Sequence, residues 1–324
     1  MRRLLLRCGL SPGDVLMMTA AVRDLRRAWG DRYLVDVRTA ARELWENNPY
    51  LTPVDDDVDD LVEIHMEYPL IHRSNELPYH FIHGFRMFLE DRLRVRIPAG
   101  PFRGDVHLTD AEREVPPALR RASGDPRPIW LVAAGGKYDF TAKWWPPSSF
   151  QQVIDRLRDE VCFVQVGSHE HFHPDLEGVI DLRGRTPLRE FLSLVHWSDG
   201  VLCPVTFLMH LAAAVPTRDG GLRPCVVVAG GREPPHWEAY PGHHFLHTIG
   251  ALDCCATGGC WKSRTEALGD GSELDHPDAL CLRPSRGYPE CMTLIDPDTV
   301  AGHIRMCLRD KRTHAAQASA AETQ

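Results

Sequence analysis

The feature that most constrains the fold is an alternation of short apolar runs and amphipathic segments, which occurs twice along the chain. Near the N-terminus, the apolar run "RLLLRC" precedes the turn "GLSPGD", a stretch with apolar residues at helical spacing, "VLMMTAAVRDLRRAW", and a second apolar run, "YLVDV". This order of strand, turn, helix and strand is typical of parallel α/β sheets. The sequence therefore predicts an α/β protein.

The same alternation resumes after a polar stretch with four prolines at residues 109–128. The runs "PIWLVAA", "VCFVQVG", "GVLCPV" and "RPCVVVAGG" predict buried strands, and the segments between them predict helices of a doubly wound unit. We therefore predict the following organisation: an N-terminal domain over 1–120, a linker over 121–127, a C-terminal domain over 128–297 that includes a Cys-rich segment at 254–291, a C-terminal helix over 298–312, and a disordered tail over 313–324.

The overall composition excludes several classes of protein. The formal net charge of -8 and the lack of a basic stripe argue against nucleic-acid binding. No apolar run reaches the length of a transmembrane segment, and Asp14 follows the short N-terminal run too closely for a signal peptide. We expect a cytoplasmic protein, in which the ten cysteines serve as thiols or metal ligands rather than disulfides.

Two candidate site residues lie just after predicted strands, where parallel α/β proteins bind ligands. Asp14 in "GLSPGD" can either cap the following helix or act as a general base on a sugar hydroxyl. Lys143 in "AAGGKYDFTAKWWPPSSF" belongs to a chain with few lysines. It is either an exposed loop residue or a cation that neutralises a departing diphosphate without a metal ion.

Further candidates follow the next two predicted strands. Thr206 stands at the start of a predicted helix, where it can cap the helix or donate its hydroxyl to a phosphate. His210 lies one turn later and is either a core residue or a ligand contact. Gly230, Gly231 and Glu233 follow the strand "RPCVVVAGG" and are candidates for the nucleotide side of the site.

Five stretches together carry a resemblance to a known family: "GLSPGDVLMMTAAVRDLRRAW", "NNPYL", "KWWPPSSFQQVIDRL", "IDLRGRTPLREFLSLVHWSDGVL" and "MHLAAAV". In order and spacing, over about residues 4–230, they resemble the signature segments of glycosyltransferase family 9, the ADP-heptose heptosyltransferases and their relatives. The resemblance implies the GT-B fold, in which two Rossmann-like parallel α/β domains face a central cleft. The acceptor then binds mainly to the first domain and the nucleotide sugar mainly to the second.

The resemblance also implies a reaction. It is an inverting transfer, with no covalent intermediate and no metal ion, from an ADP-heptose-like donor to an acceptor hydroxyl. Asp14 becomes the catalytic base, Lys143 contacts the donor diphosphate or sugar, and Thr206, Met209 and His210 fall in the donor-binding motif. The acceptor can be a glycan such as a lipopolysaccharide core, a protein or a small natural product, and the oligomeric state stays open.

One motif departs from the family pattern. Family members usually carry an Asp-Ser/Thr-Gly triplet shortly before the Met/Leu-His pair, whereas this chain has Val205, Thr206 and Phe207 there. The departure leaves three alternatives open: a differently configured heptose, a different nucleotide sugar, or an inactive homologue. The last corresponds to a non-catalytic, metal-stapled protein that binds sugar nucleotides or acts as a scaffold.

The late cysteines form a separate pattern. Cys255, Cys260, Cys281 and Cys291 surround a polar insert, "KSRTEALGDGSELDHPDAL", that has too few apolar residues to hold itself in place. Four thiolates predict one structural zinc or iron ion, because four sulfur ligands leave no open position for a substrate. The glycines of "TGGC" are expected to let the backbone wrap around a ligand sulfur.

Several alternatives to this metal site stay open. Cys254 can exchange roles with Cys255, and free buried thiols or a disulfide pair are alternatives to a metal. A metalloenzyme that acts through the cluster is a third functional alternative. The branch of heptosyltransferases that modifies autotransporter proteins is similar in having a four-cysteine iron site late in the chain.

Overall fold

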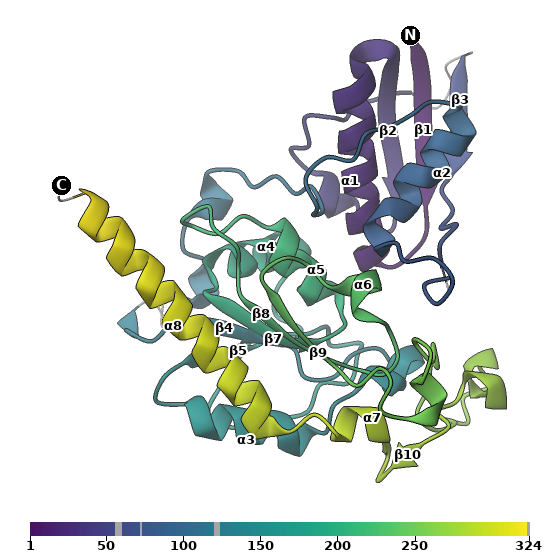
Figure 1. Cartoon of the computed structure of the whole chain (residues 1–324). Helices are drawn as coiled ribbons and strands as arrows, with labels where there is room; N and C mark the ends of the chain where they lie inside the picture. Colours follow the sequence, from purple (N-terminus) through teal and green to yellow (C-terminus); the bar gives the residue numbers. More distant parts are fainter. Residues whose placement is uncertain (56–59, 72, 120–123, 323–324) are drawn as a thin grey trace.

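The chain folds into two halves, each built on its own parallel sheet (Figure 1). The structure, a computed structural model, describes residues 1–55, 60–71, 73–119 and 124–322, with side chains up to residue 310. A three-stranded sheet forms the N-terminal half, and a six-stranded sheet forms the C-terminal half. The prediction of an α/β protein is confirmed.

The N-terminal sheet has the strand order β2-β1-β3, with both neighbours parallel to β1. Its elements are β1 (Arg2–Cys8), α1 (Pro12–Trp29), β2 (Tyr33–Thr39), β3 (Leu61–His65) and α2 (Gly84–Leu93). Leu4, Leu5 and Leu6 of the central strand are all fully buried, so both faces of the sheet are covered there. Among the described residues this sheet has fewer strands than its C-terminal counterpart.

The C-terminal sheet has the order β6-β5-β4-β7-β8-β9, entirely parallel. Its strands are β4 (Ile129–Val132), β5 (Cys162–Gln165), β6 (Ile180–Asp181), β7 (Gly200–Pro204), β8 (Cys225–Gly230) and β9 (His243–His247). Its helices are α3 (Pro147–Leu157), α4 (Leu188–Trp197), α5 (Phe207–Ala214) and α6 (Pro235–Glu238). The order reverses between β4 and β7, which is the point where doubly wound sheets bind ligands.

The predicted linker and the predicted tail lie at the two ends of the C-terminal half. Residues 121–123 of the predicted linker lie outside the described residues, and β4 begins shortly afterwards at Ile129. The C-terminal helix α8 extends over Pro297–Glu322, so the prediction of a disordered tail after residue 312 is wrong. The tail is rich in alanine, the residue with the highest helix propensity, and it prolongs a helix already anchored on α3.

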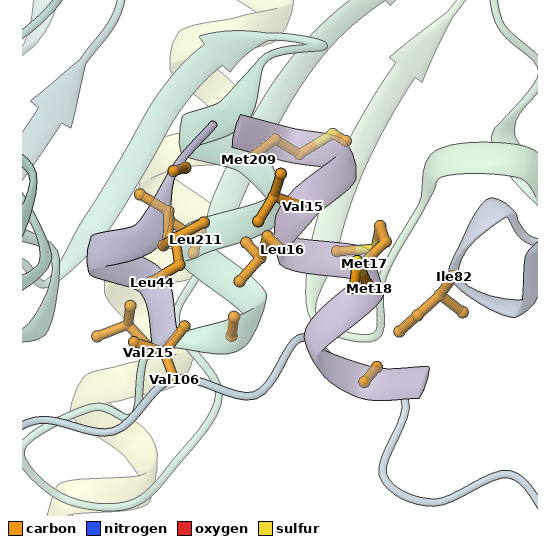
Figure 2. Close-up of a cluster of buried hydrophobic side chains, with 14 of the residues drawn as sticks. Val15, Leu16, Met17, Met18, Leu44, Ile82, Val106, Met209, Leu211 and Val215 are labelled. Atoms are coloured by element: carbon orange, nitrogen blue, oxygen red, sulfur yellow. The ribbon is translucent and has the colours of Figure 1, made fainter. Parts of the chain in front are cut away.

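An apolar interface between α1 and α5 joins the two halves. Val15, Leu16 and Met17 of α1 are fully buried, as are Met209 and Leu211 of α5. Figure 2 shows these side chains together in a single cluster. Because α1 packs directly on α5, the first turn of α1 has a fixed position relative to the end of the C-terminal sheet.

This packing makes a prediction about Met209. Met209→Ala removes a fully buried side chain at the interface and is expected to lower the free energy of unfolding by about 2–5 kcal/mol. Met209→Leu nearly conserves the volume and is expected to cost less than about 1.5 kcal/mol. Urea unfolding measures both, with Met306→Ala as the control because Met306 is 43% exposed on α8. Equal stability of Met209→Ala and wild type would contradict the assignment of Met209 to the core.

Candidate active site

Asp14 lies in the first turn of α1 rather than at its cap. The helix begins at Pro12 after the N-cap residue Ser11, which makes no side-chain capping bond. Burial raises the pKa of the Asp14 carboxyl, and Lys143, Lys137 and backbone N–H groups oppose the rise without cancelling it. The side chain is thus an aspartate held in a partly desolvated place, next to two cations and the positive end of a helix.

The two lysines come from the connection between β4 and α3 in the other half. The Nζ atom of Lys137 donates to the hydroxyl of Ser11 at 2.8 Å, directly before α1. Lys143 ends a 3-10 helix, Tyr138–Lys143, and its Nζ lies 2.8 Å from Glu233 Oε1. The structure therefore brings Asp14 and Lys143 to one place, although the sequence separates them by an entire domain.

Glu233 forms an ion pair with Lys143. Burial acts to raise its pKa, but Arg232 and Lys143 outweigh burial, and the net effect is a pKa below the ordinary value. The carboxylate is nearly inaccessible, and its Oε2 atom has no hydrogen-bond partner in the structure. Glu233 is therefore ionised, holds Lys143 in position and keeps one acceptor atom unused.

The donor-motif residues lie on α5, with different environments. Thr206 is the N-cap residue of α5, and its hydroxyl is buried without a partner. His210 Nδ1 lies 3.0 Å from the Tyr240 hydroxyl, and its Nε2 faces Glu238 Oε2 at 3.6 Å. Burial lowers the pKa of His210 well below its ordinary value, so its ring is neutral. Met209 points into the apolar interface described above.

The two glycines after β8 lie against the C-terminal segments instead. A Cβ atom on Gly230 would stand 2.4 Å from Met292 Sδ, and one on Gly231 would stand 2.9 Å from Cys255 Sγ. Both positions need glycine because α7 (Glu290–Thr293) and the Cys-rich segment pack closely on this strand end. Their surroundings point to packing as their role.

Sequence reasoning missed three residues of the site. Lys137 was visible only as a second lysine in the same loop, and its bond to Ser11 was not predictable. Glu238 and Tyr68 gave no signal at all, because each reaches the site by long-range packing. Burial raises the pKa of both side chains well above their ordinary values, and the charge of Asp14 contributes in both cases.

Four cysteines of the late segment surround a small cavity of about 10 Å³. They are Cys254, Cys260, Cys281 and Cys291. The thiol of Cys255 instead points to the carbonyl oxygens of Thr248 and Leu252, at 3.5 and 3.4 Å. Within the described part of the chain, no three His, Cys, Asp or Glu side chains are arranged closely enough to hold a metal ion. Thiols are a donor type that zinc and iron accept, and it is Cys254 rather than Cys255 that lines the cavity with Cys260, Cys281 and Cys291.

The polar insert between these cysteines has an organiser that the sequence analysis did not identify. The guanidinium of Arg264 is almost completely inaccessible and donates to Asp270 and Asp275, at 2.8 and 2.5 Å. These bonds lower the pKa of Asp270 to about 2. Thr265 adds two hydrogen bonds to Thr141. The buried Arg264 side chain therefore helps to hold the insert in place.

Comparisons with known proteins show what the chain is similar to. The model of glycosyltransferase family 9 (heptosyltransferase) matches residues 79–222. This match spans less than half of the chain. It includes Lys143, Thr206 and His210, and it excludes Asp14 and the Cys-rich segment. None of the curated proteins matches the sequence.

Solved structures of glycosyltransferases share the fold along nearly the whole chain. A family 9 glycosyltransferase from Veillonella parvula is 12% identical, with a TM-score of 0.66 over 95% of this chain and 97% of the other. The ADP-heptose lipopolysaccharide heptosyltransferase II of E. coli is 15% identical, with a TM-score of 0.64 over 96% and 100%. The iron-containing dodecameric heptosyltransferase TibC of enterotoxigenic E. coli, in complex with ADP-D-β-D-heptose, is 18% identical, with a TM-score of 0.63 over 95% and 77%.

These matches confirm the GT-B fold, and the match to the family 9 model over residues 79–222 supports a glycosyltransferase. Among the described residues, no helix combines the length and the apolar character that crossing a bilayer requires.

Proposed function

We propose that this protein is an inverting glycosyltransferase that moves a heptose, or a related sugar, from an ADP-sugar to an acceptor hydroxyl. The observation that carries the proposal is the meeting of Asp14 from one half with Lys137 and Lys143 from the other. A base and a pair of cations on opposite walls are what a direct displacement at an anomeric carbon needs.

Asp14 is the base in this proposal. As the acceptor oxygen attacks the anomeric carbon, its proton moves to the Asp14 carboxylate, while the bond to the donor diphosphate breaks on the opposite face of the sugar. The adjacent lysines and the helix start keep the carboxylate ionised near neutral pH, although burial raises its pKa. Burial also makes the carboxylate a stronger base than a solvated aspartate.

Lys143 and the start of α5 act on the leaving group. Glu233 fixes the Lys143 ammonium, and the backbone N–H groups at the start of α5 with the free hydroxyl of Thr206 offer donors to a phosphate. These groups stabilise negative charge on the departing diphosphate without a metal ion. The names of the similar solved structures, heptosyltransferases acting with ADP-heptose, support the choice of donor.

The acceptor and the setting are part of the same proposal. A glycan, a protein hydroxyl and a small natural product all offer the attacking group that Asp14 requires. Ten free cysteines are consistent with the reducing cytoplasm, where we place the enzyme. We also propose that the acceptor domain ends near residue 120 and the donor domain begins at residue 128.

The assignment of the base has a direct test. Incubation with ADP-heptose and a panel of truncated lipopolysaccharide, serine-rich peptide and small alcohols is expected to give acceptor-dependent release of ADP. Asp14→Asn is expected to lower that turnover by a factor of about 10²–10⁴. Asp31→Asn, at an exposed aspartate of the same half, is the control and is expected to match wild type. In wild type, turnover is expected to fall as the pH decreases through the raised pKa of Asp14. Full turnover by Asp14→Asn would show that another group is the base.

We further propose that Cys254, Cys260, Cys281 and Cys291 hold one structural iron or zinc ion. The supporting observation is that these four thiols, and not that of Cys255, line one cavity. Such an ion would tie the end of the polar insert to α7 and to the segment after β9, and would take no part in the transfer.

Elemental analysis of the purified protein tests this site. One equivalent of iron or zinc per chain is expected, and Cys254→Ser is expected to lower that content substantially while Cys255→Ser leaves it near one. The two variants are matched because the residues are neighbours with the same chemistry. Loss of the metal in Cys255→Ser alone would restore Cys255 as the ligand, and the lack of any stoichiometric metal in wild type would remove the site.

A further inference from the structure

The connection from β3 to the 3-10 helix Phe81–His83 crosses to the C-terminal half and contacts the Cys-rich segment. At its tip, the Asn75 side-chain amide pairs with the backbone of Gly259, which lies 184 residues away in the chain. Asn75 Nδ2 donates to the Gly259 carbonyl at 2.9 Å, and the Gly259 N–H donates to Asn75 Oδ1 at 2.8 Å. Both hydrogen-bonding faces of the amide are thus used in one contact between the halves.

The preceding residue adds two more bonds across the same boundary. The Ser74 hydroxyl accepts from the indole N–H of Trp261 at 3.0 Å, and the Ser74 carbonyl accepts from His236 Nε2 at 2.9 Å. Ser74 is only 2% exposed, so the serine is enclosed by its partners. We call the contact of Ser74 and Asn75 with residues 258–261 the clasp.

The backbone on the Cys-rich side is shaped for this contact. Gly258 has a φ of +153°, and a Cβ atom there would lie 2.3 Å from Asn75 Oδ1. A Cβ atom on Gly259 would lie 2.3 Å from the Arg232 carbonyl. Trp261 has a φ of 56°, a left-handed conformation that is rare for a bulky side chain. Such strain persists only where the surrounding structure fixes it. Within "TGGCW", Gly258 is therefore fitted to Asn75 of the clasp, and Gly259 is fitted to the Arg232 carbonyl.

Aromatic contacts connect the clasp to His210 on α5. The Trp261 ring packs edge-on against Trp237 with centroids 5.7 Å apart, and Trp237 lies 5.9 Å from Phe81. Phe81 in turn lies 4.9 Å from His210. The Tyr68 hydroxyl donates to the Phe81 carbonyl, and this bond joins the beginning of the connection after β3 to its end at Phe81.

Tyr68 also connects the clasp to Asp14. The two side chains are close enough that the charge of Asp14 acts on the Tyr68 phenol. Tyr68 is 9% exposed and Phe81 is 6% exposed, and Phe81 packs on His210, whose ring would lie 3.5 Å from a Cβ atom on Gly13, the residue before Asp14. The groups around Asp14 whose charge can act on it come from four further segments: Cys8 of β1, Tyr68, Lys137 and Lys143 of the β4–α3 connection, and Glu238 of α6.

We propose that Ser74 and Asn75 are positioning residues, which dock on the Cys-rich segment and thereby hold Tyr68 and Phe81 as a cover over Asp14. The Cys-rich segment then also affects the surroundings of Asp14, because it holds the segment that carries Tyr68 and Phe81 in position. The catalytic consequence rests on the proposed function of Asp14, whereas the docking itself does not. Loss of the clasp lets water reach the carboxylate and removes part of the desolvation that burial imposes on it.

Hydrogen exchange on the full-length protein tests the docking without any substrate. Asn75→Ala is expected to speed exchange by about fivefold or more, the factor for a lost hydrogen bond of about 1 kcal/mol, both in peptides of residues 73–83 and in peptides of residues 256–262. Asn75→Asp keeps the shape of the side chain but sets an oxygen against the Gly259 carbonyl, and the same result is expected. Glu76→Ala is the control, because the ion pair of Glu76 with Arg73, three residues earlier, is exposed to solvent. Unchanged exchange in residues 256–262 would overturn the docking.

A titration of Asp14 tests the positioning role and does not depend on knowing the acceptor. In protein labelled with ¹³C at aspartate carboxyls, the signal of Asp14 is assigned by its loss in Asp14→Asn. Breaking the clasp by Asn75→Ala or Asn75→Asp is expected to return the pKa of Asp14 toward its ordinary value, with an acid dissociation constant at least about threefold higher. Glu76→Ala is expected to leave the titration unchanged. Faster exchange in both segments with an unchanged Asp14 titration would reduce the clasp to a structural contact. Failure of the proposed function would instead appear as full turnover of Asp14→Asn, with both clasp measurements unaffected.

Discussion

The packing of α1 on α5 is the interaction on which the rest of the site depends. Val15 to Met17 on one helix and Met209 to Leu211 on the other are enclosed by a cluster that includes residues of both halves (Figure 2). Apolar burial has no directional preference, but interlocked side chains fix the separation and orientation of the two helices. Since Asp14 precedes this interface by a single residue, and His210 lies within it, their relative position follows from core packing.

Electrostatics then determines what this position can do. The carboxylate is partly desolvated, which raises its pKa, and two lysines from the opposite half limit the rise. Glu233 compensates the charge of Lys143 from the other side, at 2.8 Å. Glu233 also pairs with Arg232, so both of its cationic partners belong to the C-terminal half. Removal of Lys143 would leave Glu233 paired with Arg232, whereas removal of Glu233 would leave both cations without this carboxylate.

The sequence predicted the parts of this structure that arise from local patterns. Apolar runs with turns between them were enough to predict the parallel sheets, and Gly-containing turns after the strands indicated where ligands bind. The meeting of Asp14 with Lys143 followed only from the family resemblance, because no local pattern relates positions so far apart. Lys137 and Glu238 were missed for the same reason, and so was the pairing of Asn75 with Gly259.

Other features that the sequence left undetermined had local causes. The spacing of the cysteines left the roles of Cys254 and Cys255 open, since the orientation of adjacent thiols depends on the turn of the 3-10 helix Asp253–Cys255. The tail was predicted to be disordered because its residues are small and polar. It is also rich in alanine, which favours helix, and α8 extends through it to Glu322. In the insert, Arg264 is one of many arginines in the sequence, and only its burial between Asp270 and Asp275 reveals its role.

In the proposed reaction, one displacement occurs between a base on α1 and cations on the β4–α3 connection. The configuration of the transferred sugar in the product distinguishes this reaction from its alternatives. NMR of the product made from an ADP-heptose of known anomeric configuration gives the one-bond coupling at the anomeric carbon. A single displacement gives the opposite configuration in the product. Retention of the donor configuration would contradict it, because retention requires either a second displacement or attack on the face from which the diphosphate departs.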